Sequence, residues 1–207
     1  EERQRSEQLL HQMIPRHIAD ALRRGERVNA EIYPEATILF SDVVNFTTIA
    51  AGSTAMEVCT MLDSLYNEFD ELIDKYPSLY KLSNVPSTPL SRSPAPRPLS
   101  HARIPDPSGD PNLDLDLVGS RRVTTNMGAP IQIRVGIHTG SVVGGVVGRK
   151  MPRFHLFGDT GGASRMESHG LAGAVHISAA SRALITNPAK YLITERGEIA
   201  VKGKGLM

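Results

Sequence analysis

Hydrophobic residues recur at three- and four-residue spacing in two stretches of the chain, the spacing that forms one face of an α-helix. In the first stretch, residues 1–24, Pro15 interrupts the pattern, so we expect a kink or a break between two helices there. This helix could pack on its own domain or end a coiled coil that joins two chains. The second stretch, residues 54–76, begins with Thr54 and Glu57 at capping-box spacing and ends before Pro77. Both stretches are therefore predicted to be helical.

Short apolar or alternating segments predict strands along the rest of the chain. The predicted strands are residues 36–41, 131–137, 154–157 and 174–177, and short helices are predicted at 163–169 and 179–185. Residues 191–194 and 198–201 are predicted to form a hairpin around Arg196 and Gly197. Strands that alternate with helices indicate an α/β or α+β sheet domain.

Proline and serine dominate residues 83–127, where eight of the fourteen prolines of the chain lie between Pro86 and Pro111. Such a segment buries too little apolar surface to offset the entropy lost on ordering, so we expect a disordered loop. A regular alternation of apolar and polar residues returns abruptly at Ile131. The segment is either a genuine insertion or a misread intron or frame error, and the abrupt return favours the second.

Composition narrows the class of protein without identifying it. The formal net charge of +1 gives no indication of nucleic-acid binding, and no apolar run approaches the roughly 20 residues that span a bilayer. Cys59 is expected to be a buried free thiol, which suits a reducing, cytoplasmic compartment. Because the chain starts at Glu1, we interpret it as a fragment of a longer protein, in which a sensor domain or membrane anchor could lie upstream.

Candidate chemistry lies at the ends of predicted strands. Asp42 follows strand 36–41, where its carboxylate could bind a hard cation such as magnesium or cap the following turn. His138 has no partner evident in the sequence and is interpreted as structural. Basic residues in the C-terminal half lie near glycines and could bind phosphate or line a solvated strand end. They are Arg149, Lys150, Arg153, Arg165, Lys202 and Lys204.

The order of several sequence segments is more informative than any single residue. They read YPEATILFSDVVNFT, IQIRVGIHTGSVVGGVVGRKMPRF, HLFGDT, ASRMESHG and RGEIAVKGKG. Together they resemble the motifs of class III nucleotide cyclases, over about residues 8–82 and 129–206. The segment LLHQMIPRHIADALRRGERV resembles the signalling helix of receptor-type and soluble guanylate cyclases. The guanylate type is therefore favoured.

This resemblance implies an α+β fold, a ferredoxin-like class III cyclase sheet with flanking helices, preceded by a signalling helix. Residues 1–31 would be the signalling helix or coiled-coil linker, and residues 32–207 the catalytic domain. The family converts a nucleoside triphosphate to a 3′,5′-cyclic monophosphate and pyrophosphate, so GTP is the implied substrate and ATP the alternative. The site lies between two chains, which implies a homodimer or a heterodimer with another cyclase chain.

The resemblance also assigns roles to individual residues. Asp42 matches the first metal-binding aspartate, and Val43 the neighbour that offers its backbone carbonyl to Mg²⁺ or Mn²⁺. Arg165 matches the arginine that stabilises charge at the α-phosphate. Lys202 matches the lysine that contacts the terminal phosphates.

Several positions depart from the family pattern. Ser83 replaces the purine-selecting side chain, and Ser87 replaces the second metal-binding aspartate. Gly161 and Gly162 stand where the family has Val-Asn-Thr, so the transition-state asparagine is missing and the segment is one residue short. His155 stands where guanylate cyclases usually have Cys and adenylate cyclases Asp. The sequence therefore leaves open an active guanylate cyclase, a non-catalytic dimer partner and a generic nucleotide-binding module.

Overall fold

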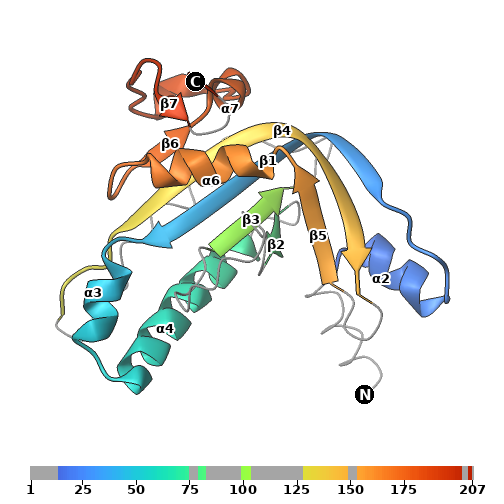
Figure 1. Cartoon of the computed structure of the whole chain (residues 1–207), viewed down its shortest axis with the longest axis horizontal. Coiled ribbons are helices and arrows are strands. Elements are labelled where there is room, and N and C mark those ends of the chain that lie inside the picture. The colour runs from blue at the N-terminus through green and yellow to red at the C-terminus, as the bar shows by residue number, and fades with distance from the viewer. Residues whose placement is uncertain are drawn as a thin grey trace.

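A curved β-sheet forms the centre of the molecule (Figure 1). The computed structural model describes residues 14–74, 79–82, 99–103, 128–148, 153–201 and 205–206. Within these residues, five antiparallel strands follow the order β2-β3-β1-β4-β5. Their bounds are Glu31–Val43 (β1), Leu79–Leu82 (β2), Leu99–Arg103 (β3), Ile133–Val147 (β4) and Arg153–Gly158 (β5). The short strand β6, Val175–Ile177, pairs with β4 in parallel.

Strand β4 organises the sheet because both of its edges are paired. One edge pairs with β1 along almost the whole strand. On the other edge, residues 142–147 pair with β5 and residues 135–137 pair with β6. The chain from β5 to β6 forms helix α6, Thr160–Ser168. Residues 138–141 of β4 therefore lie between the two partner strands, next to the start of α6.

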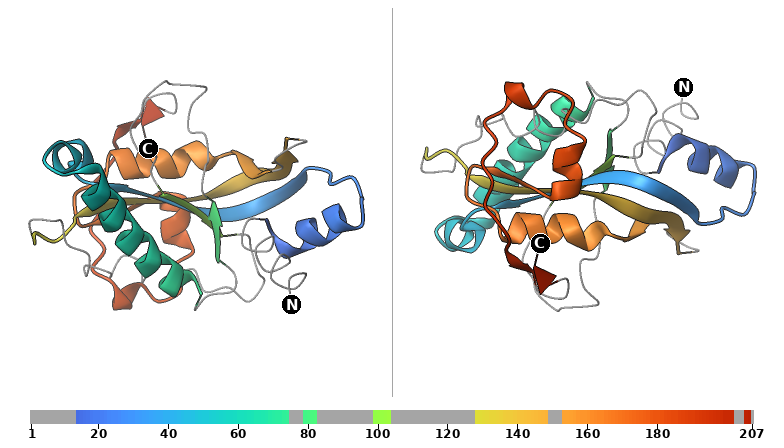
Figure 2. Two further views of the ribbon diagram at one scale, coloured as in Figure 1. Left: turned by 90° about the horizontal axis from the view of Figure 1, so that it is seen from below. Right: turned by 90° about the horizontal axis from the view of Figure 1, so that it is seen from above.

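Alternating side chains of β1 build two cores, one on each face of the sheet. Ile38 and Phe40 belong to a cluster that includes residues of α6 and of helix α2, Arg16–Arg23. Leu39 belongs to a second cluster with the inner face of helix α4, Ala55–Ile73. Figure 2 shows α4 and α6 on opposite faces of the sheet. This alternation is what the period of two in a strand requires when both faces are covered.

Both long helical predictions are confirmed in the residues that the structure describes. Helix α2 begins directly after Pro15 and packs on its own domain through Ile18 and Ala19, which supports the first alternative for this segment. Residues 1–13 lie outside the described part. The capping box of α4 forms as expected: the Thr54 N–H donates to Glu57 Oε2 at 2.7 Å, and the Glu57 N–H donates to Thr54 Oγ1 at 3.3 Å.

The prediction that Cys59 is buried is wrong, since the structure exposes this thiol on α4. The inner stripe of the helix consists of Met61, Leu65 and Phe69, each one turn after the last. Two residues correspond to about 200° of helix rotation, so Cys59 lies almost opposite Met61. A buried role for the thiol is therefore excluded within this chain.

Two predictions about irregular regions also need correction. Disorder across residues 83–127 does not hold for residues 99–103, which form β3 between β1 and β2; most of the segment lies outside the described residues. The predicted hairpin is displaced: of its eight residues, Ala200–Val201 form β7, which pairs with Gly205–Leu206 (β8). Gly197 and Gly205 both have positive φ angles, so the backbone freedom of glycine alone did not determine which of them lies next to a ladder.

The remaining elements are short. Helix α3 spans Phe46–Ala51, α7 spans Ala179–Ala183, and a 3₁₀ turn, η2, spans Pro188–Lys190. No helix in the described residues is both long enough and apolar enough to cross a membrane.

Candidate functional site

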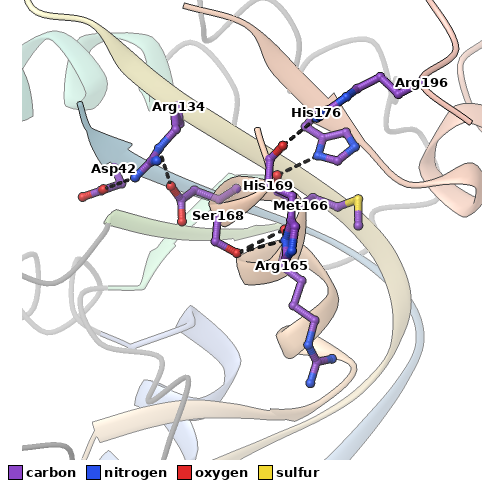
Figure 3. Close-up of polar contacts among 9 residues, drawn as sticks. Asp42, Arg134, Arg165, Met166, Ser168, His169, His176 and Arg196 are labelled. Atoms are coloured by element: carbon purple, nitrogen blue, oxygen red, sulfur yellow. Dashed lines mark hydrogen bonds and ion pairs between the residues drawn. The ribbon is translucent and has the colours of Figure 1, made fainter. Parts of the chain in front are cut away.

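Asp42, the predicted metal ligand, lies at the end of β1 and forms an ion pair. The antiparallel register places it directly opposite Arg134 of β4. Arg134 Nη2 donates to Asp42 Oδ2 at 2.9 Å, as Figure 3 shows. Both side chains are about one-third exposed to solvent, 32% for Asp42 and 34% for Arg134. The carboxylate expected to face a metal ion therefore already faces a guanidinium group.

The same guanidinium contacts a second carboxylate, which comes from α6. Arg134 Nε lies 3.2 Å from Glu167 Oε1, and the Glu167 side chain is only 8% exposed. Neither atom has a hydrogen-bond partner in the described part of the chain, so this contact is an ion pair. Burial raises the pKa of the Glu167 carboxyl, and the negative charge of Asp42 raises it further, whereas Arg134 lowers it. Asp42, Arg134 and Glu167, here called the charge triad, connect β1, β4 and α6.

A two-metal centre needs several carboxylates or other oxygen ligands around both ions. In the described residues, no group of three or more His, Cys, Asp or Glu side chains is placed to hold a metal ion. Asp42 supplies one carboxylate and is paired with Arg134, while Val43 ends β1 beside it. The residues described here therefore do not fit the two-metal centre that the resemblance implies.

Arg165, the predicted transition-state arginine, projects away from the charge triad. It lies on α6, and Figure 3 shows its guanidinium group pointing in a different direction from Asp42 and Arg134. Among the described residues, its guanidinium group has no ion pair and no hydrogen bond, although its backbone carbonyl accepts a bond from His169. The structure therefore does not bring Asp42 and Arg165 together within one chain.

The missing residue before Arg165 does not prevent α6 from forming. The helix starts at Thr160, directly after Asp159, and runs without a break through Arg165. Gly161 stands one turn before Arg165, and a Cβ atom built on it would lie 3.5 Å from Arg165 Nη1. The position from which a side chain could approach this arginine is therefore filled by a glycine.

His138 has a partner that the sequence analysis missed. Its Nε2 atom lies 2.8 Å from Asp159 Oδ2, and the imidazole ring is buried against Gly162. A Cβ atom on Gly162 would lie 2.3 Å from His138 Cδ2, so only glycine fits there without a shift. His138 and Asp159 thus fasten the start of α6 to β4. The motifs His-Thr-Gly and Gly-Asp-Thr contain both residues, but only the register between β4 and β5 shows that they are in contact.

The structure describes only some of the other predicted site residues. His155 lies on β5, half-buried, with its ring 6.1 Å from that of Phe157, and its buried Nδ1 has no hydrogen-bond partner in the described part of the chain. Arg153, at the start of β5, is exposed. Six predicted positions lie outside the described residues: Ser83, Ser87, Arg149, Lys150, Lys202 and Lys204. The purine-contacting, second metal-binding and terminal-phosphate roles therefore stay predictions.

Comparison with known proteins gives a consistent family. Residues 28–207 match the family described as adenylate and guanylate cyclase catalytic domain. The chain is 44% identical over its whole length to the guanylate cyclase soluble subunit beta-2 of Rattus norvegicus, and 39% identical to the atrial natriuretic peptide receptor 2 of Homo sapiens. It spans 30% of the first of these proteins and 20% of the second.

A solved structure gives the same answer for the fold. The guanylate cyclase domain of RhGC from Catenaria anguillulae, in complex with GTP, superposes with a TM-score of 0.71 at 29% identity. The match covers 86% of this chain and 94% of that domain. It confirms the α+β cyclase sheet with flanking helices that the sequence predicted. On these grounds the chain belongs to the adenylate and guanylate cyclase catalytic domain family.

Proposed function

We propose that this chain is the cyclase domain of a guanylate cyclase that converts GTP to 3′,5′-cyclic GMP and pyrophosphate between two chains. The observation that carries the proposal is the divergent placement of Asp42 and Arg165 (Figure 3). Because the two side chains project apart within one chain, a site that uses both must take each from a different chain. Relatives described as guanylate cyclases, matched along the whole chain, support GTP over ATP.

The reaction joins the ribose 3′-oxygen to the α-phosphorus and breaks the bond from that phosphorus to the β-phosphate bridge, while the 3′-hydroxyl loses its proton. Arg165 suits the charge that develops on the α-phosphate, because its guanidinium group has no anionic partner among the described residues. Divalent Mg²⁺ or Mn²⁺ supplies electrophilic assistance in this family. Since the described residues do not fit two metal ions, no step of this chain is assigned to them.

We expect the rate of this chain to be low. Gly161 offers no side chain next to Arg165, and Ser87 offers a hydroxyl where a carboxylate is expected. If each missing group supplies a few kcal/mol to the transition state, the rate falls by roughly two powers of ten or more for each group.

The test is product formation by the purified domain with GTP and Mn²⁺, followed by chromatography and mass spectrometry. Cyclic GMP that is formed by the wild-type chain and lost in Arg165→Ala supports the proposal. Faster turnover of ATP than of GTP would replace it with the adenylate alternative. Absence of both cyclic products from a folded dimer would overturn the enzymatic proposal.

A second candidate, a non-catalytic dimer partner, is favoured by the ion pair between Asp42 and Arg134. In this case the domain would pair with a cyclase chain that carries intact site residues, and would change its activity. Co-expression with such a chain tests the idea. A heterodimer on size exclusion with altered cyclic GMP output supports it, whereas two separate species would exclude it. Both proposals place the domain in the cytoplasm.

A further inference from the structure

We propose that Arg134, held by Glu167, serves as the built-in counter-ion of Asp42, and that this pairing disfavours a divalent cation at the Asp42 carboxylate. The inference rests on the proposed function only in taking Asp42 as the metal-binding position. It assigns a role to two residues, Arg134 and Glu167, that the predicted site did not include.

The first argument is the fixed geometry of the two strands. Asp42 and Arg134 are directly opposite each other in the ladder between β1 and β4, which pairs along eleven registered positions. Side chains of such a cross-strand pair leave the same face of the sheet a few ångströms apart. The 2.9 Å contact therefore follows from the strand register and does not require a rearrangement of either strand.

The second argument is that Glu167 prevents Arg134 from turning away. Its carboxylate is almost fully buried between α6 and β4, and a Cβ atom on Gly136 would lie 2.0 Å from the Glu167 backbone nitrogen, so the helix and strand are in close contact there. A buried carboxylate needs a compensating positive charge. Within the described residues, Arg134 is the cation in contact with it. The guanidinium group is thus anchored at one end and presented to Asp42 at the other.

The third argument is the difference in exposure between the two contacts. The Asp42 end of the charge triad is about one-third exposed, whereas the Glu167 side chain is 8% exposed. The interaction at the exposed end is more strongly screened by water. The contact with Glu167 is therefore the firmer of the two, and it keeps Arg134 beside Asp42.

The experiment measures Mn²⁺ binding to the whole chain without nucleotide, by the loss of the electron paramagnetic resonance signal of free Mn²⁺. Arg134→Met is expected to bind Mn²⁺ roughly three- to tenfold more tightly than wild type, because a neighbouring positive charge is removed from Asp42. Adding Asp42→Asn to Arg134→Met should abolish that gain. The matched control is Arg24→Met, which removes an exposed arginine paired with Glu26 and should leave binding unchanged. Equal Mn²⁺ binding by Arg134→Met and wild type would overturn the proposal.

Removal of Arg134 alone leaves Glu167 buried without its cation, so that variant could fail to fold. The double variant Arg134→Met/Glu167→Gln removes both charges and is tested in parallel, with the same gain in binding expected. A second readout is the melting temperature in EDTA: Asp42→Asn should lower it in the wild-type background but not in the double variant. A carboxylate that served only as a metal ligand would leave the wild-type value unchanged or raise it, which contradicts the proposal. Neither readout uses catalysis, so an inactive enzyme would not affect the result.

Discussion

Two adjacent glycines of α6 have different surroundings, although the sequence presents them as a pair. A side chain on Gly162 would collide with the His138 ring, with 2.3 Å to Cδ2, whereas a side chain on Gly161 would meet the end of Arg165 at 3.5 Å. Gly162→Ala should therefore reduce the free energy of unfolding by about 1–3 kcal/mol, the typical cost of overpacking. Gly161→Ala should leave it unchanged or raise it by up to about 1 kcal/mol, because alanine favours the helix. Urea denaturation measures the free energy of unfolding of both variants. Equal effects would show that the His138 ring moves aside without cost to accommodate the new methyl group.

His176 gives the chain a measurable pH dependence of stability. Burial lowers its pKa, with smaller contributions from the positive charge of Arg196 and from His169, while a bond between its Nδ1 and the Met166 carbonyl raises it. The unfolded chain then takes up a proton more readily than the folded chain. Stability that is present above the ordinary histidine pKa of about 6.5 should be lost as the pH falls below it.

The measurement is the urea midpoint at pH 7.5 and pH 5.5, for wild type and for His176→Gln. Glutamine can still donate to the Met166 carbonyl but does not titrate, so the variant should lose less stability between the two pH values. The raised pKa of Glu167 acts in the opposite direction in acid, and it is common to both proteins, so it cancels in the difference. Identical losses of stability in the two proteins would show that protonation of His176 does not destabilise the folded chain.

Local residue patterns were readable from the sequence, whereas contacts between distant residues were not. The capping box of Thr54 and Glu57 was predicted because its partners are three residues apart. The pair of Asp42 and Arg134 spans 92 positions, so it depends on a strand register that no local pattern fixes. The partner of His138 was missed for the same reason.

At the scale of elements, α2 is tied to the catalytic sheet by a small buried face. Ile18 is 3% exposed and belongs to the cluster that contains Tyr33 and Phe154, whereas the neighbouring His17 is exposed. Ile18→Ala should lower the free energy of unfolding by about 2–4 kcal/mol, since it removes buried methylene groups and leaves a cavity. His17→Ala should cost well under 1 kcal/mol. Thermal or urea unfolding of both variants tests whether α2 is part of the folded unit, and similar small losses would show that it is not.

Strand positions were predicted better than strand lengths. Residues 36–41 were expected as the first strand, but β1 spans Glu31–Val43 and continues across a register shift between Tyr33 and Ala36. The glycine-rich part of β4 was not predicted as strand because glycine disfavours strands locally. It pairs nonetheless, since Gly140 and Gly144 leave room for Asp159 and for the rings of Phe154 and Tyr33. Tertiary contacts, rather than propensity, therefore set the length of these strands.

At the scale of the whole molecule, the fold does not bring the two predicted catalytic side chains, Asp42 and Arg165, together within one chain. Asp42 is bound to Arg134, which also contacts Glu167 of α6. Arg165 lies on the same helix but projects away from them. The family fold could be inferred from the order of its motifs, because that order is a property of the whole chain. Whether the site is complete could not be inferred, because the proposed site needs a second chain and residues outside the described part.

A site shared between two chains predicts complementation between inactive variants. Asp42→Asn and Arg165→Ala should each reduce cyclic GMP formation by roughly a hundredfold or more, because each spoils both sites of a homodimer. In an equal mixture, half of the dimers contain one chain of each kind, and one of their two sites then has both residues intact. The mixture should therefore recover about a quarter of the wild-type rate. A mixture of Asp42→Asn with the double variant Asp42→Asn/Arg165→Ala should recover nothing, since no site has an intact Asp42. If mixed dimers form and the first mixture also stays inactive, Asp42 and Arg165 do not act together across the two chains.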